Sequence, residues 1–154
     1  MSDDVVALGM KYFNKEGHNC AQTVMRTVLE HYGMDFKEST KAMAGLGGGV
    51  GLDGNVCGAV SGAVAALGVL NSRRFEDFEQ HKNETYTSAL KFMYKFRKKH
   101  ETIICDELTG ITMSDKDART KAIDTGVFHR ICPQFVEDAI RIVVEMEDKM
   151  GGVS

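Results

Sequence analysis

Four cysteines are the residues of this 154-residue chain that most readily support chemistry. They are Cys20, Cys57, Cys105 and Cys132, and helix patterns place at least three of them where a helix should begin. The first four backbone N–H groups of a helix lack intrahelical partners and the macrodipole is positive there, so a thiolate at that end is stabilised. We therefore expect these positions to carry reactive or metal-binding sulfur.

The spacing of the cysteines excludes a compact zinc finger. Successive cysteines are 37, 48 and 27 residues apart, whereas zinc fingers use paired CxxC ligands. Any common site must therefore be assembled by the fold. If the helix starts meet on one side of a bundle, their dipoles favour several thiolates in one place.

Composition places the chain among single globular domains. Its length suffices to bury an apolar core without disulfides, and its formal charge of -3 predicts no attraction to nucleic acid or to an anionic membrane. The chain begins without the features of a secretory signal, and the apolar run over residues 56–70 is shorter than the roughly 20 residues that cross a bilayer. We expect a cytoplasmic protein with no nucleic-acid partner and no membrane insertion, in a compartment that disfavours permanent disulfides.

A single proline and the helical spacing of apolar residues predict an all-α fold, a single-domain multi-helix bundle over residues 1–154. The expected helices span residues 4–15, 19–32, 36–46, 56–70, 73–100 and 114–124, with a last helix from 132. Asn19 is the expected N-cap of the second helix, which puts Cys20 at the first helical position. Proline is favoured at that position, so Pro133 predicts Cys132 as the cap of the last helix. In the long helix expected over residues 73–100, the spacing of apolar residues predicts that Phe78 is buried.

The helix expected over residues 56–70 is apolar on nearly every side and rich in small residues, so it should be the central helix. Asn55 is its expected N-cap, which places Cys57 in the first turn. The preceding segment, residues 45–54, formally contains GxGxxG, but no strand or βαβ pattern frames it as a dinucleotide site. A tight connector is the favoured interpretation. Gly49, Gly51 and Gly58 are nevertheless positions where backbone N–H groups are expected near the site.

Two histidines lie close to cysteines in the sequence. His18 precedes Cys20 by two residues, and His129 precedes Cys132 by three. Either ring is able to replace a thiolate ligand or to shift the pKa of a thiol. Ordinary polar partners near a helix start explain both histidines equally well. We therefore include them only as substitutes for a cysteine ligand.

The segment Cys57-Gly58-Ala59-Val60-Ser61-Gly62 reads CGAxxG, with Cys20 upstream and Cys105 and Cys132 downstream. In this order of cysteines the chain resembles the C_GCAxxG_C_C family of redox-active proteins over essentially its whole length. The resemblance implies a small helical protein whose four cysteines carry the activity, either as thiols or as ligands of an iron–sulfur cluster. Members are often encoded near transporters, which implies a transporter-associated partner. Related domains occur in haem-containing electron-transfer proteins, but no CxxCH sequence for covalent haem is present here.

Three functions remain open. The first is electron transfer by an iron–sulfur cluster bound to all four cysteines, with an electron donor or acceptor protein as partner. The second is thiol–disulfide exchange, in which Cys57 is the better nucleophile and another cysteine resolves. The third is a non-catalytic interaction module with a closed zinc site, or four unrelated buried thiols without a cofactor. A homodimer is also open, because the small-residue face of Gly58 and Gly62 can pack within one bundle or between two.

Overall fold

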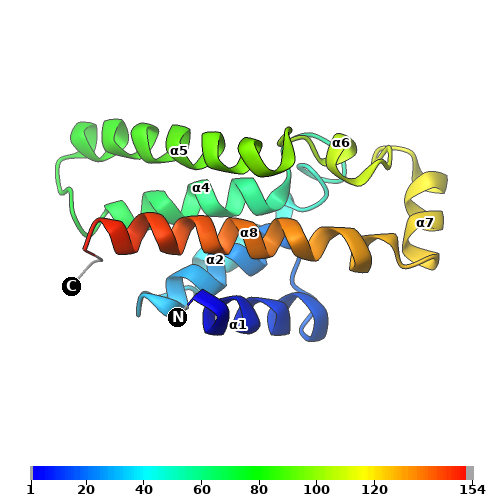
Figure 1. Ribbon diagram of the computed structural model, residues 1–154, viewed down its shortest axis with the longest axis horizontal. Helices are drawn as coiled ribbons and strands as arrows, with labels where there is room; N and C mark the ends of the chain where they lie inside the picture. Colours follow the sequence, from blue (N-terminus) through cyan, green and yellow to red (C-terminus); the bar gives the residue numbers. More distant parts are fainter. Residues whose placement is uncertain (1, 152–154) are drawn as a thin grey trace.

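The computed structural model describes residues 2–151 and has the expected all-α fold (Figure 1). The described residues form α1 (Ser2–Lys15), α2 (Cys20–His31), α3 (Lys37–Ala42), the short 3-10 helix η1 (Ala44–Leu46), α4 (Gly58–Asn71), α5 (Phe78–His100), α6 (Cys105–Thr109), α7 (Lys116–Asp124) and α8 (Val127–Lys149). One isolated β-bridge joins Val56 and Ile104. None of the described helices combines the length and the apolar character that a membrane span requires.

α4 is the central helix, as its composition predicts. It packs against α2, α5 and α8, and in Figure 1 it lies between α5 and α8. α2 and α4 approach each other closely at Gly62, where an added Cβ atom would lie 2.6 Å from the carbonyl oxygen of Ala21. The small residues of α4 are therefore used for packing inside one chain.

α5 begins later than the sequence pattern predicts. Its N-cap is Asp77, whose carboxylate accepts a hydrogen bond from the N–H of Gln80. The predicted burial of Phe78 is wrong: this side chain is 85 % exposed. The reason is that the chain turns after α4 instead of continuing as a helix, and the buried Phe92 and Phe96 lie further along α5.

Other helix boundaries also differ from the expected ones. Residues 36–46 form α3 and η1 rather than one helix, and α7, which was expected from residue 114, is capped by Asp115 and begins at Lys116. α8 begins at Val127, directly after Gly126, which adopts a left-handed conformation with φ of 71°. The predicted start at Cys132 is wrong, since the helix already contains Pro133 in its interior.

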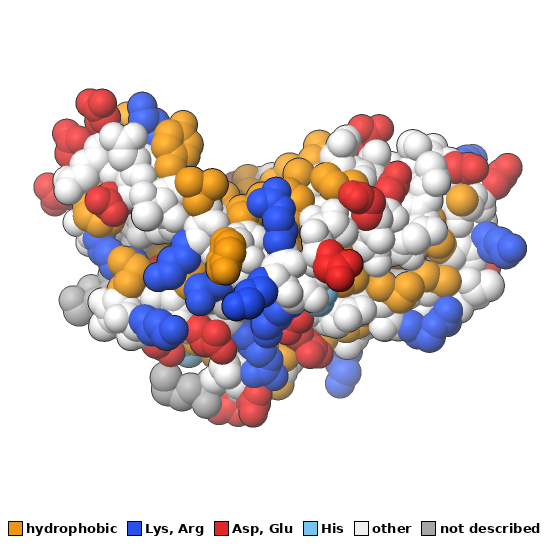
Figure 2. All heavy atoms as spheres, turned by 45° about the horizontal axis from the view of Figure 1, so that its top comes forward, with side chains coloured by type: hydrophobic (Ala, Val, Ile, Leu, Met, Phe, Trp, Pro, Cys, Tyr) orange, Lys and Arg blue, Asp and Glu red, His pale blue; other side chains and the backbone are white. Residues whose placement is uncertain are grey.

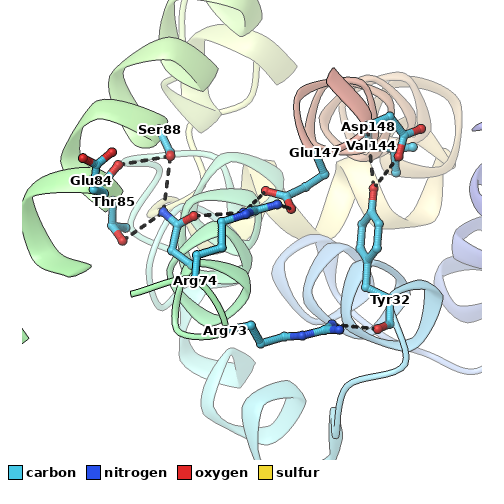
Figure 3. A network of polar contacts seen from close by, with 10 residues as sticks. Tyr32, Arg73, Arg74, Glu84, Thr85, Ser88, Val144, Glu147 and Asp148 are labelled. Atoms are coloured by element: carbon cyan, nitrogen blue, oxygen red, sulfur yellow. Dashed lines mark hydrogen bonds and ion pairs between the residues drawn. The ribbon is translucent and has the colours of Figure 1, made fainter. Parts of the chain in front are cut away.

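A buried ion pair ties the turn after α4 to α8 (Figure 3). The Arg74 guanidinium donates to both carboxylate oxygens of Glu147, at 3.2 and 2.6 Å. Glu147 is only 1 % exposed, and a bidentate partner is what makes a buried carboxylate tolerable. Arg74 also donates to Asn71, which in turn donates to Thr85 and Ser88 on α5. This network fixes the end of α4 that lies away from the cysteines.

Replacing Gly62 with alanine tests the close approach of α2 and α4. The added Cβ would press on the backbone of Ala21, so we expect Gly62→Ala to lower the free energy of unfolding by about 1–3 kcal/mol. Gly68→Ala, in the same helix, is the matched control. Its Cβ would meet only Thr85 Cγ2, at 3.6 Å, and alanine stabilises a helix by up to about 1 kcal/mol relative to glycine. Urea denaturation followed by circular dichroism measures both variants, and equal stability would contradict the close packing.

Candidate functional site

All four cysteines line one cavity of about 240 Å³. Cys20 is the first residue of α2, Cys57 precedes α4, Cys105 is the first residue of α6, and Cys132 lies within α8. All four are free thiols. The cavity lies where α2, α4 and α6 begin, so Cys20, Cys57 and Cys105 are at helix starts, whereas Cys132, which was expected at one, is not.

Cys20 is positioned by the N-cap of α2. The Asn19 side chain accepts a hydrogen bond from the N–H of Gln22 at 2.9 Å, and the Gln22 side chain accepts one from the N–H of Asn19 at 3.1 Å. This reciprocal capping box fixes the first turn of the helix. The Asn19 amide also donates to the carbonyl of Ala44 in η1, at 3.0 Å. The same residue therefore orients Cys20 and holds η1 beside it.

Cys57 and Cys105 are brought together by pairing of the backbone before each of them. The N–H of Cys57 donates to the carbonyl of Ile103 at 2.7 Å, and the N–H of Cys105 donates to the carbonyl of Asn55 at 2.6 Å. We call this antiparallel pairing of residues 54–57 with 103–106 the backbone clamp. Asn55 thus contributes its carbonyl to the clamp, and the cap of α4 is Cys57 itself rather than the predicted Asn55. The clamp joins two cysteines that are 48 residues apart in the sequence.

The glycine-rich loop packs directly against this clamp. Gly49 has a φ of 71°, and a Cβ there would lie 2.8 Å from Cys105 Cβ and 2.5 Å from the backbone nitrogen of Asn55. A Cβ on Gly58 would lie 3.2 Å from Cys20 Cβ. Gly49 and Gly58 therefore lie beside the thiols, as expected. Gly51 faces open space, and the sequence expectation for it gains no support.

Cys132 differs from the other three because it lies in the second turn of α8. Its backbone is inside the helix, and Pro133 follows it without an N–H to donate to the preceding turn. The helix dipole is therefore not the feature that tunes this thiol. The thiol of Cys20, across the cavity, lowers its pKa instead.

Cys20 and Cys132 interact through a side-chain hydrogen bond. The Cys20 thiol lowers the pKa of Cys132 below its ordinary value. The same hydrogen bond, followed by burial and by the other thiols, raises the pKa of Cys20 well above its ordinary value. A coupled pair of this kind loses a first proton far more readily than a second. Cys132 is therefore the thiol that most readily becomes a thiolate.

Cys57 and Cys105 are held as neutral thiols. Burial raises the pKa of Cys57 to about 11, although the N–H groups of Ala59 and Val60 act in the opposite direction. Burial and the neighbouring Cys57 and Cys132 raise the pKa of Cys105 to about 12. A helix start lowers a thiol pKa only where desolvation does not outweigh it. The electrostatics therefore favour Cys132, rather than the expected Cys57, as the nucleophile.

The two candidate histidines do not line the cavity. The His18 ring stacks on Tyr12, with ring centroids 5.4 Å apart, and its Nε2 lies 3.1 Å from the Arg26 guanidinium. His129 is exposed on the first turns of α8. His18 therefore has ordinary polar and aromatic partners and His129 faces solvent, which agrees with the alternative that neither histidine is a ligand.

The rest of the cavity wall is mainly apolar and was not identified from the sequence. It includes Phe13, Leu52, Leu108, Met113, Ile123, Phe128 and Phe135. Leu52 and Ile123 are 43 % and 60 % exposed, which places them at the mouth. Leu52 has a φ of 67°, a conformation that branched residues rarely adopt, so the loop holds it there against its local preference. Ile123, a large apolar residue on the otherwise polar helix α7, is a sequence signal that could have indicated the mouth.

Arg119 is the charged residue in the described wall, and its guanidinium donates to the carbonyl of Met113 at 2.6 Å. This hydrogen bond links α7 to the segment after α6. The charge is thus engaged by the backbone, and the lining that faces the thiols is almost entirely apolar. A cavity of this kind favours uncharged groups over ions.

Four cysteine thiolates are the usual ligands of an iron–sulfur cluster and can also form a structural zinc site. Clusters are held by four cysteine thiolates, and four cysteines surround this cavity. A zinc ion needs ligands about 2.3 Å from the metal. Within residues 2–151, no group of three or more His, Cys, Asp and Glu side chains is arranged to hold a metal ion. The arrangement of the described side chains therefore favours neither a zinc ion nor a cluster over the other.

Alkylation kinetics test the order of thiol acidity. At about pH 8 we expect iodoacetamide to modify Cys132 first, since a lowered pKa gives it the largest thiolate fraction, while Cys57 and Cys105 react only as the pH approaches 11 and 12. Peptide mass spectrometry over a pH series gives each rate. Cys20→Ala removes the hydrogen-bond donor and should slow Cys132 by about tenfold per unit of pKa regained. Faster alkylation of Cys57 than of Cys132 would contradict the assignment.

Comparison with known protein families matches residues 18–146 to the family described as "Putative redox-active protein (C_GCAxxG_C_C)". This span includes all four cysteines. No curated protein and no solved structure matches the chain. In this chain the central cysteine comes before its glycine, as Cys57-Gly58, whereas the family name writes the two in the other order. Most of the chain is covered, and it therefore belongs to the C_GCAxxG_C_C family.

Proposed function

We propose that this protein exchanges electrons through a dithiol–disulfide couple formed by Cys20 and Cys132. The observation that carries the proposal is that Cys20 and Cys132 line one cavity, where the two thiols shift each other's pKa in opposite directions. A disulfide requires its two sulfur atoms to meet, and Cys20 and Cys132 line the same cavity. Cys57 and Cys105 remain neutral thiols beside it.

The proposed reaction reduces a small disulfide that enters the cavity. The Cys132 thiolate attacks one sulfur of the substrate, so a mixed disulfide forms while the substrate S–S bond breaks and a thiolate leaves. Cys20 gives its proton to that leaving thiolate and attacks Cys132 Sγ. The Cys20–Cys132 disulfide forms and the second half of the substrate leaves as a thiolate. Two electrons pass from the protein to the substrate, and a reducing dithiol of a partner protein returns them.

The apolar wall supports this chemistry in two ways. It excludes water from the mixed disulfide, and it disfavours charged substrates because their desolvation is not compensated. The substrate is therefore a small, uncharged disulfide that passes between Leu52 and Ile123. A cytoplasmic location, where reducing dithiols are available, fits the regeneration step. The electron-donor protein, or a transporter-associated partner, is part of this proposal.

A second candidate function is electron transfer by an iron–sulfur cluster. The specific observation in its favour is that four elements each contribute one cysteine to a single cavity of about 240 Å³. Cys20, Cys57, Cys105 and Cys132 would be the ligands, and the bound cluster would supply one-electron chemistry. The raised pKa values of Cys57 and Cys105 mean that metal binding must displace their protons.

Mild oxidation tests the dithiol couple. We expect the neutral reagent 4,4′-dithiodipyridine to release both of its halves and to leave a Cys20–Cys132 disulfide, found as a linked peptide by mass spectrometry. Cys132→Ser should abolish the linked peptide, whereas Cys105→Ser, the matched control in the same cavity, should retain it. The dianionic reagent DTNB should react more slowly, because its carboxylates are poorly solvated in an apolar cavity. Formation of a different disulfide in the wild-type protein would argue against this couple.

Anaerobic reconstitution tests the second candidate. Protein reduced and supplied with iron and sulfide should, if it binds a cluster, acquire iron and acid-labile sulfide in matching amounts together with visible thiolate-to-iron absorption. Single Cys→Ser variants of all four residues should then lose that absorption. Colourless protein with no bound iron would exclude the cluster and leave the dithiol couple as the function.

A further inference from the structure

α5 carries a large exposed apolar stripe that the redox site does not use. Tyr86, Leu90 and Tyr94 are 62 %, 71 % and 67 % exposed, one helical turn apart. The opposite side of α5 packs on α4 and α8 through Phe92 and Phe96, which are fully buried. Figure 2, which is turned to bring the side of α5 forward, shows hydrophobic side chains exposed on this face with lysine and arginine side chains beside them. Contiguous exposed apolar side chains mark interaction surfaces.

Tyr86 and Leu90 also belong to a row with the spacing of a helix–helix seam, which includes the half-buried Met93, while Tyr94 lies beside this row. Alternating steps of four and three residues connect Glu79, Asn83, Tyr86, Leu90, Met93 and Arg97. We call these six residues the α5 seam. Steps of four and three keep one face of a helix against a neighbouring helix, as in coiled coils. The apolar residues occupy the middle of the seam and its charged residues occupy the two ends. The occupant suited to this surface is therefore another helix.

The charges at the ends of the seam identify that helix as α5 of a second copy. Glu79 and Arg97 are both exposed, and no ion pair within the described part of the chain engages either side chain. In an antiparallel pair centred between Tyr86 and Leu90, each Glu79 lies opposite Arg97 of the other copy. Parallel pairing would set like charges against each other.

The same register agrees at the other positions. It places Tyr86 against Leu90 of the second copy, so the exposed apolar side chains of the seam cover each other. Beyond the seam, the first half of α5 carries Glu84, whereas its last turns carry a basic run, Arg97-Lys98-Lys99. Antiparallel pairing therefore matches both the apolar centre and the charge gradient of the helix.

We propose that two copies of this protein pair antiparallel along α5, through the α5 seam, about a two-fold axis at the level of Ser88. This surface differs from the small-residue face of α4, because Gly62 is already packed against Ala21 of the same chain. α6, which begins one wall of the cysteine cavity, follows directly after the last turn of α5. The pairing therefore places the two cavities at opposite ends of the dimer. It is independent of the redox chemistry that the cysteines perform.

Light scattering of the full-length, reduced protein during size-exclusion chromatography tests the pairing. We expect the mass of two chains, falling towards one chain on dilution. Leu90→Asp introduces a charge at the centre of the seam and should give a monomer with an unchanged circular dichroism spectrum. Phe78→Asp is the matched control, since Phe78 is exposed on the same helix but outside the seam, and it should remain dimeric. A wild-type monomer at every concentration, or a Leu90→Asp variant that still dimerises, would overturn the proposal.

A charge exchange tests the antiparallel register. Glu79→Arg and Arg97→Glu each place like charges opposite each other at both ends of the seam, so each should raise the dissociation constant about fivefold or more. The double variant Glu79→Arg/Arg97→Glu restores opposite charges and should recover the wild-type constant. Analytical ultracentrifugation gives the three constants. A double variant as weak as the single variants would overturn the register, because it would show that these side chains do not meet.

Discussion

The close approach of α2 and α4 is the constraint on which the rest of the structure depends. Ala21 and Gly62 are in contact through backbone atoms, and a side chain on Gly62 would not fit. Because Cys20 immediately precedes Ala21 and Gly58 lies one turn before Gly62, the same contact sets Cys20 beside the start of α4. Packing in the centre of the bundle therefore fixes the position of a thiol at its end. The buried Arg74–Glu147 pair secures the other end of α4, so the central helix is held at both ends.

The backbone clamp adds what helix packing does not supply. α6 is a single short helix with little apolar surface of its own, and side-chain burial alone would orient it poorly. Hydrogen bonds from Cys57 and Cys105 to backbone carbonyls of the opposite segment fix it instead. Gly49 makes this possible, since only a residue without a Cβ can lie so close to Asn55 and Cys105 at a positive φ. The glycine-rich loop is thus a support for the site.

Structural features that depend on residues close together in the sequence could be predicted from it, whereas features that depend on distant residues could not. The N-cap at Asn19 and the helical spacing of α2 involve residues within one or two turns, and both predictions are confirmed. The preference for proline at the first helical position is only statistical, and it misplaced the start of α8, where Gly126 turns the chain earlier. The backbone clamp joins two segments that have no regular secondary structure, so no periodic pattern in the sequence indicates it. The acidity of Cys132 depends on Cys20, 112 residues away, so it became visible only with the fold.

The two proposed redox functions differ in how much negative charge they place in the apolar cavity. An apolar wall tolerates few uncompensated charges, and the hydrogen bond from Cys20 stabilises one thiolate, on Cys132. Oxidation to a disulfide removes that charge, so the cavity favours the oxidised couple and the neutral thiols of Cys57 and Cys105. Four thiolates are compatible with the same wall only when metal ions supply positive charge between them. In the proposed function, the reduced protein without iron would carry out two-electron thiol chemistry, and one-electron chemistry would require iron to displace the thiol protons.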